Sequence, residues 1–188
     1  MNLLWDFDGT LFNTYPTYTA IYKHVIGPST DENEIYRKLK VSFSHAIRYY
    51  ALTKKQVKEI YDKIADIPVH DPQPFPGVEE VLKRADKNLI MTHKDRSEVE
   101  AILRHHDWLR YFSEIVTEKD GFPRKPDPEA YRYLHEKYHL DLVIGDRTID
   151  IKPAQELGIK TCLFQNKEKG ADYYVNDYRD FFGSVPGL

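Results

Sequence analysis

The sequence predicts an α/β fold: a Rossmann-like parallel sheet core that carries an inserted α-helical cap subdomain. Five short apolar runs indicate buried strands, at residues 2–6, 88–92, 114–117, 141–145 and 159–164. Apolar residues between the later runs recur at helical spacing, and strands that alternate with helices form parallel sheets covered on both faces. The block from about residue 15 to residue 71 breaks this alternation, because it contains helical patterns and no convincing strand.

The first half of the chain is expected to contain one strand and the helical insertion. The apolar run at residues 2–6 is followed by Asp8-Gly9, and Asp-Gly is a typical turn dipeptide. Four helical stretches are then marked by Tyr18, Tyr22 and Val25; Ile35 and Leu39; Phe43 and Ile47; and Val57, Ile60, Tyr61 and Ile64. Thr53 suits the N-cap of the last stretch, and four prolines between residues 68 and 76 close the insertion.

The second half is expected to alternate strands with helices. The helices are marked by Val78, Val81 and Leu82; Val99, Ile102 and Leu103; Tyr131, Leu134 and Tyr138; and Ile149 and Ile151. The polar and aromatic tail after Gly170 indicates only a short helix near residues 177–182. We therefore expect a core domain of residues 1–14 and 73–188, and a cap subdomain of residues 15–72.

Composition excludes several classes of function. The 188 residues include 27 Lys and Arg against 30 Asp and Glu, so the formal charge is −3 and no broad cationic surface for nucleic acid is expected. The single cysteine, Cys162, cannot form an intramolecular disulfide. Asp6 and Asp8 interrupt the N-terminal apolar stretch that a signal peptide needs, and no segment approaches the roughly 20 apolar residues of a membrane span. A cytoplasmic protein without nucleic-acid or membrane partners is expected, and the sequence says nothing about its oligomeric state.

Charged and hydroxylic residues follow the predicted strands, at the edge where open parallel sheets bind ligands. The candidates are Asp6 and Asp8 after the first strand, Thr92 and His93 after the second, Lys125 in the loop after the third, and Asp146 and Asp150 after the fourth. Carboxylates packed closely raise one another's pKa or bind a cation, and oxygen-only ligands favour a hard ion such as Mg²⁺. Because Mg²⁺ often shares its site with a substrate phosphate, phosphate-ester chemistry is expected.

Four ordered motifs in this chain resemble those of the haloacid dehalogenase superfamily, and the match covers nearly the whole sequence. The motifs are Asp6-Phe-Asp-Gly-Thr-Leu11, Thr92 after an apolar strand, Lys125-Pro-Asp-Pro128 and Gly145-Asp146-Arg-Thr-Ile-Asp150. The helical insertion after the first motif resembles the cap of the phosphoglycolate phosphatase-like branch. His93 stands where related phosphatases often carry Asn, so the resemblance leaves its role open.

The resemblance implies roles for the core residues. Asp6 would attack phosphorus and form an aspartyl-phosphate, and Asp8 would protonate the leaving alcohol and then activate water. Thr92 and Lys125 would bind the phosphoryl group, although Thr92 could instead cap the helix that begins near Asp95.

The resemblance also implies the metal site and the place of substrate selection. Mg²⁺ would be held by the Asp6 carboxylate, the Asp8 main-chain carbonyl and Asp146, with Asp150 in support. Lys40, His45 and Arg48 lie in the middle of the cap, where relatives place specificity residues, but a solvated helix face explains them equally well.

These observations predict a Mg²⁺-dependent phosphatase acting on a small phosphorylated metabolite. One alternative is a sugar phosphomutase that uses the same aspartyl-phosphate. The other is a non-catalytic binding or regulatory protein on this fold, which the full set of candidate catalytic residues disfavours.

Overall fold

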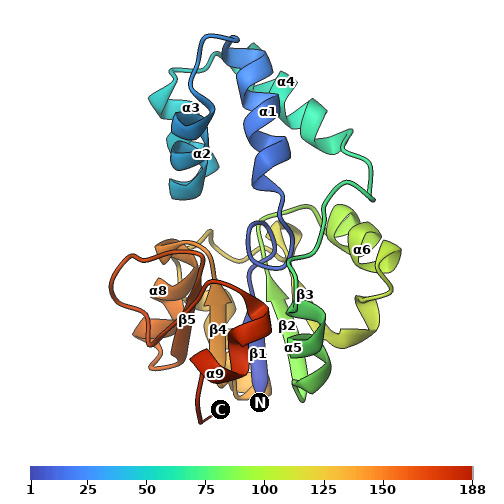
Figure 1. Cartoon of the computed structure of the whole chain (residues 1–188), viewed down its shortest axis with the longest axis vertical. Coiled ribbons are helices and arrows are strands. Elements are labelled where there is room, and N and C mark those ends of the chain that lie inside the picture. The colour runs from blue at the N-terminus through green and yellow to red at the C-terminus, as the bar shows by residue number, and fades with distance from the viewer. Residues whose placement is uncertain (188) are drawn as a thin grey trace.

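In the computed structural model, which describes residues 1–187, a six-stranded sheet lies below a group of helices (Figure 1). The strands are β1 (Asn2–Trp5), β2 (Lys87–Met91), β3 (Phe112–Val116), β4 (Leu142–Gly145), β5 (Lys160–Phe164) and β6 (Tyr173–Val175). Their order across the sheet is β3-β2-β1-β4-β5-β6, and every neighbouring pair is parallel. The chain builds outward from β1 to β3 on one side and from β4 to β6 on the other, so the topological switch point lies between β1 and β4. The predicted α/β fold is confirmed.

Side chains alternate along β1 and thereby enter two apolar cores. Leu3 and Trp5 belong to the core under α5 (Val78–Arg84), α6 (Arg96–His105) and α9 (Phe181–Ser184), whereas Leu4 belongs to the core under α7 (Glu129–Tyr138) and α8 (Thr148–Glu156). Short 3-10 helices complete this part, at η1 (Leu109–Tyr111), η2 (Glu118–Asp120) and η3 (Tyr178–Asp180). Because helices cover both faces, the central strands are apolar on both sides, which produces continuous apolar runs rather than alternation.

The helical insertion consists of α1 (Tyr15–Ile26), α2 (Glu32–Val41), α3 (Phe43–Tyr49) and α4 (Lys54–Ala65), and it lies beyond the carboxyl edge of the sheet (Figure 1). Tyr22, Ile35, Leu39 and Ile60 form its own buried core. Thr53 caps α4 as predicted, in a capping box in which its hydroxyl accepts from the backbone of Gln56.

The tail after Gly170 differs from its prediction. The helix expected near residues 177–182 is present as η3 and the short α9, but the preceding strand β6 was missed because it has only three residues. Tyr178 stacks on Phe164 with ring centroids 4.2 Å apart and donates a hydrogen bond to the carbonyl of Thr10 at 3.0 Å. The tail thus supports the loop that follows β1. No helix within residues 1–187 is long and apolar enough to cross a membrane.

Candidate active site

Three carboxylates meet at the switch point of the sheet. Asp6 directly follows β1, Asp146 follows β4, and Asp150 lies in the first turn of α8. One carboxylate oxygen from each lies within 4.8 Å of the others, and all three residues are buried. The backbone amide of Asp6 continues the pairing of β1 with β4 by donating to the carbonyl of Ile144 at 3.0 Å. This sheet hydrogen bond fixes the position of the Asp6 backbone, and therefore the point from which its side chain extends.

Two glycines allow the backbone to approach this cluster. Gly9 has a φ of +80°, and a Cβ there would lie 2.7 Å from Oδ2 of Asp146 and 2.3 Å from the ring of Tyr15. A Cβ on Gly145 would lie 2.4 Å from the Cβ of Asp150. Any larger residue at either position would displace a site carboxylate.

Lys125 bridges two of the carboxylates. Its Nζ lies 2.6 Å from Oδ1 of Asp6 and 2.9 Å from Oδ1 of Asp150, and its side chain is 1% exposed. Burial disfavours the ammonium, but the two carboxylates outweigh it and raise the pKa of Lys125 above its ordinary value. The structure therefore places Lys125 beside Asp6 and Asp150 at the carboxyl edge of the sheet, and its side chain stays cationic.

Arg147 is a site residue for which the sequence analysis assigned no role. Its guanidinium bonds Asp150 at 3.0 and 3.1 Å, and it also lies 3.9 Å from Asp6. The available signal was its place inside the fourth motif, directly after Asp146, although an arginine at a helix start is more commonly solvated. Here the side chain is only 15% exposed.

The cations do not neutralise the three carboxylates equally. Arg147 and Lys125 outweigh the effect of burial and hold the pKa of Asp150 below its usual range. Burial, aided by the charge of Asp150, raises the pKa of Asp6 to about 7, although Lys125 and Arg147 oppose it. Burial also raises the pKa of Asp146 despite its ion pair with Lys40. Asp6 and Asp146 are thus the two carboxylates that a further bound cation would stabilise in the ionised form.

The donor set of this cluster fits a hard divalent cation. It offers buried carboxylate oxygens and no nitrogen or sulfur ligand, which suits Mg²⁺. The hydroxyl of Thr10 adds weak contacts, at 3.5 Å from Asp6 and 3.4 Å from Asp146. Asp8 is not part of the carboxylate cluster.

Asp8 and Thr92 line a cavity of about 550 Å³ that also reaches Asp6 and Lys125. The Asp8 side chain is 23% exposed and bonds Tyr18 rather than the cluster. Thr92 is buried, and its hydroxyl oxygen accepts from the backbone of Lys94 at 3.2 Å. Asp95, not Thr92, caps α6.

The predicted residues of the insertion separate into two groups. His45 and Arg48 line the cavity from α3, opposite the carboxylates. Lys40, at the end of α2, forms an ion pair with Asp146, and its ammonium lies 4.9 Å from the ring centroid of Tyr15. Lys40 therefore contacts the carboxylate cluster itself.

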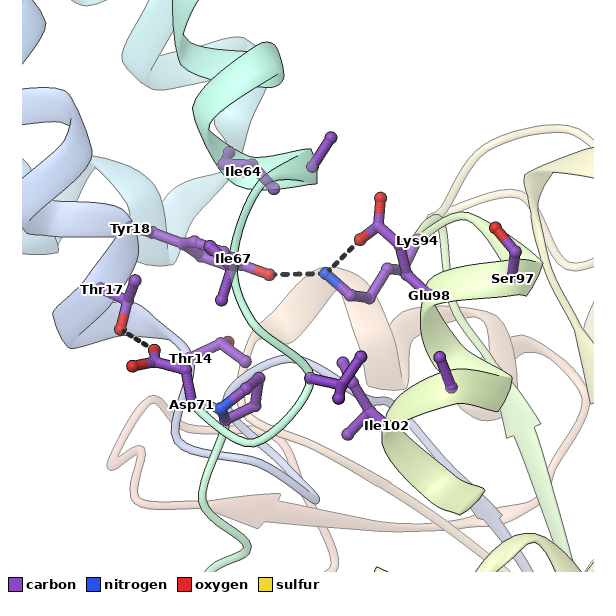
Figure 2. Close-up of a pocket in the computed structure, with 14 residues that line it drawn as sticks. Thr14, Thr17, Tyr18, Ile64, Ile67, Asp71, Lys94, Ser97, Glu98 and Ile102 are labelled. Carbon is purple, nitrogen blue, oxygen red and sulfur yellow. Dashed lines mark hydrogen bonds and ion pairs between the residues drawn. The ribbon is translucent and has the colours of Figure 1, made fainter. Parts of the chain in front are cut away.

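A smaller cavity of about 240 Å³ lies behind Tyr18, between the insertion and α6 (Figure 2). Ile64 and Ile67 face it from the end of α4 and the segment that follows, and Ile102 faces it from α6. Tyr18 and Lys94 line both cavities and therefore stand between them.

His93 positions the backbone of the bridging lysine. Its Nε2 accepts from the Lys125 amide at 2.8 Å, which places the ring proton on Nδ1. Burial, together with the charges of Lys125 and Arg124, lowers the pKa of His93 to about 3, so the ring is neutral in the folded protein.

This neutral histidine predicts a pH-dependent stability. Below its ordinary pKa of 6.5 the unfolded chain binds a proton that the folded chain does not, so folding loses stability as the pH falls. His93→Gln keeps an acceptor but does not titrate. Between pH 7 and pH 5 the wild type should lose about 1–2 kcal/mol more free energy of unfolding than the variant, after allowance for partial exposure. Urea unfolding at the two pH values tests this, and equal losses would contradict the protonation argument.

Comparisons with known proteins agree with this geometry. Residues 3–164 match the family model described as haloacid dehalogenase-like hydrolase. A pyrophosphatase, PpaX of Bacillus mycoides, is 27% identical over 202 residues, covering 94% of this chain and 90% of the relative. A hydrolase from Streptococcus pneumoniae is 34% identical with a TM-score of 0.64, covering 85% of this chain and 90% of the other. A structure described as a predicted phosphoglycolate phosphatase, from Haemophilus somnus, shares the fold at 20% identity and a TM-score of 0.77, with 96% of each chain covered.

Proposed function

The chain is an enzyme of the haloacid dehalogenase-like hydrolase family and, from this membership, we propose that it is a Mg²⁺-dependent phosphatase that hydrolyses a small phosphorylated metabolite through an aspartyl-phosphate on Asp6. One observation carries the proposal. A buried carboxylate at the end of β1 is bonded by a buried lysine and opens on a cavity that also holds a second, differently placed carboxyl group, that of Asp8.

Asp6 and Asp8 divide the chemistry between them. A carboxylate oxygen of Asp6 attacks phosphorus, and the ester P–O bond breaks while Asp8 protonates the departing oxygen. Water then attacks the phosphorus of the aspartyl-phosphate, Asp8 takes a proton from that water, and orthophosphate leaves with Asp6 restored. Asp8 suits both steps because it faces the cavity and is not tied to Lys125 or Arg147.

Lys125, Thr92 and the metal ligands prepare the site for this transfer. Lys125 offsets the charge of Asp6 and of the phosphoryl oxygens, and the Thr92 hydroxyl supplies a neutral donor. Asp6, Asp146 and the Asp8 carbonyl would hold Mg²⁺, with Asp150 orienting Lys125. The ion supplies positive charge that favours ionised Asp6 and that draws the substrate phosphate into the site.

The cavity further supports a substrate with a second anionic group. Two acidic residues that line it are already paired, Glu98 with Lys94 at 2.9 Å and Glu118 with Arg124 at 3.5 Å. Within residues 1–187 no carboxylate lies within 4.0 Å of the Arg48 guanidinium. Pyrophosphate and phosphoglycolate, which relatives are named for, both carry an anionic group beyond the scissile phosphate. We propose that helices α1–α4 act as a cap in which Arg48 binds this group.

The proposed activity predicts chelator-sensitive phosphate release. With Mg²⁺ present, a panel of pyrophosphate, phosphoglycolate and sugar monophosphates should give at least one efficient substrate, and excess EDTA should abolish turnover until Mg²⁺ is restored. Phosphate release and kcat/KM are the measurements. A requirement for a bisphosphorylated sugar, with isomerised sugar phosphate as the product, would instead indicate a phosphomutase, and turnover that survives chelation would exclude the metal.

Arg48→Met should separate substrate selection from chemistry. Losing one charged hydrogen bond is expected to lower kcat/KM roughly 10- to 100-fold for a preferred metabolite that carries a second anionic group, while p-nitrophenyl phosphate changes little because its only anionic group is the scissile phosphate. Arg37→Met is the matched control, since Arg37 lies on α2, is 69% exposed and does not line the cavity. If the two substrates decline together, or if the Arg37 variant behaves like the Arg48 variant, Arg48 does not select the substrate.

A further inference from the structure

Tyr18 connects the insertion to the carboxyl group of Asp8. From α1, its hydroxyl donates to Oδ1 of Asp8 at 2.8 Å and accepts from Nζ of Lys94 at 2.9 Å. Figure 2 shows the ring of Tyr18 pointing from α1 toward Lys94, which reaches back from the core and also bonds Glu98. Tyr18 is 2% exposed and the Lys94 side chain 8%, so the two central members of this chain of hydrogen bonds are shielded from water, while Asp8 remains partly exposed to the cavity.

Lys94 fixes the direction of the Tyr18 hydroxyl. An ammonium only donates, so the tyrosine oxygen accepts from it, and the single hydroxyl proton must point to Asp8. Burial disfavours the ammonium, but Asp8, Tyr18 and Glu98 together raise the pKa of Lys94. For Tyr18 it is burial itself that raises the pKa, so its hydroxyl stays a neutral donor.

The two oxygens of Asp8 are therefore not equivalent. Oδ1 accepts from Tyr18 and lies 3.9 Å from the Lys94 ammonium, whereas the hydrogen bonds of residues 1–187 include none to Oδ2. A protonated Oδ1 would be a hydroxyl oxygen, which is a poorer acceptor for the Tyr18 hydroxyl and for the nearby Lys94 ammonium than a carbonyl oxygen is. When Asp8 is protonated, the proton consequently belongs on Oδ2.

We propose that Tyr18 is a positioning residue for proton transfer by Asp8: by donating to Oδ1 it confines the transferable proton to Oδ2 and holds that oxygen toward the cavity. This inference rests on the proposed acid and base role of Asp8. As the ester bond breaks, the Oδ2–H bond breaks and its proton goes to the leaving oxygen. As water attacks the aspartyl-phosphate, a water proton returns to Oδ2. Tyr18 keeps its own proton throughout.

Because Tyr18 belongs to α1, the inference also gives the insertion a chemical role. The oxygen that protonates the leaving group is oriented by a side chain of the insertion, whereas Asp6 and Lys125 are oriented by the core alone. The Tyr18 hydroxyl thereby couples the binding of substrate to the insertion with the transfer of a proton from Asp8 to that substrate.

The test is Tyr18→Phe, which removes the hydroxyl and keeps the ring against Phe43, at a centroid separation of 5.3 Å. Tyr22→Phe is the matched control: Tyr22 is buried one turn later on α1, packs on the same Phe43 ring at 5.8 Å, and its hydroxyl has no hydrogen-bond partner within residues 1–187. Each variant is assayed for kcat/KM on an alkyl phosphate, whose leaving group needs a proton, and on p-nitrophenyl phosphate, whose leaving group does not. This parameter reports the steps up to ester cleavage and omits the later hydrolysis, in which Asp8 acts as a base.

Tyr18→Phe should lower kcat/KM on the alkyl phosphate roughly 10- to 100-fold and on p-nitrophenyl phosphate by less than about threefold. Asp8→Ala should show the same split with a larger amplitude, and Tyr22→Phe should show no split. A uniform decline on both substrates would assign Tyr18 a structural role only, and no decline on either would show that Asp8 needs no such support. If the wild type hydrolyses neither of these substrates nor any member of the panel described above, the proposed function itself fails and the inference fails with it.

Discussion

Asp6→Asn is expected to reduce phosphate release by about 10⁴-fold or more, the largest effect of any single substitution proposed for this protein. An amide oxygen is a poor nucleophile, and the neutral side chain removes one charge from the cluster that would bind Mg²⁺. The fold should survive, because Asp6 is a buried acid whose pKa is raised to about 7, so replacing it by a neutral amide relieves a costly charge. Phosphate release and the thermal midpoint of the same preparation measure the two effects.

Asp127→Asn serves as the control for this substitution. Asp127 accepts a hydrogen bond from the Glu129 backbone at 3.0 Å outside the carboxylate cluster, and asparagine can preserve that bond. This variant should keep near wild-type turnover. If Asp6→Asn retains turnover within tenfold of the wild type, covalent catalysis by Asp6 is excluded.

Lys125→Met is expected to lower the free energy of unfolding by about 3–5 kcal/mol, because it leaves two buried carboxylates without their shared cation. Arg147 still pairs with Asp150, so most of the cost falls on Asp6. The loss should be larger at pH 8 than at pH 5. The pKa of Asp6 is raised to about 7 in the folded protein, so at pH 5 this carboxyl group is protonated and needs no cation, whereas at pH 8 it is ionised and depends on Lys125. Urea unfolding at both pH values measures this, and turnover should be lost as well.

A surface lysine provides the comparison. Lys119 pairs with Asp95 at 2.6 Å, but its side chain is 61% exposed, and solvent-exposed pairs contribute about 0–1 kcal/mol. Lys119→Met should therefore cost far less stability than Lys125→Met. Similar costs for the two variants would mean that the buried bridge contributes no more than a surface pair.

Most of the fold could be predicted because its determinants are local. Strands buried on both faces need continuous apolar runs, and amphipathic helices need apolar residues three and four apart, so both patterns are visible along the chain. The exception, β6, has three residues and pairs only with β5 at the edge of the sheet, and such a short segment has no periodicity to detect.

The core of the site could also be predicted, for a topological reason. In a parallel sheet every strand ends at the same edge, so Asp6 and Asp146 had to come close once β1 and β4 were neighbours. The burial of Arg147 among the carboxylates and the different environments of Lys40 and Arg48 depend on packing between elements, and no local pattern contains that information.

By itself, then, the sequence determined which chemical groups stand at the carboxyl edge of the sheet and that a helical block is inserted after the first strand. Only the tertiary structure decided which group each of them contacts. Tyr18 shows the difference: helical spacing marks it as an apolar packing residue, and its ring does pack, but its hydroxyl bonds Asp8 because α1 lies directly beside the loop after β1. The physical reason is that periodicity encodes the face on which a side chain lies, whereas a hydrogen bond requires a partner within about 3 Å, and for residues on separate elements only the packing of those elements fixes that distance.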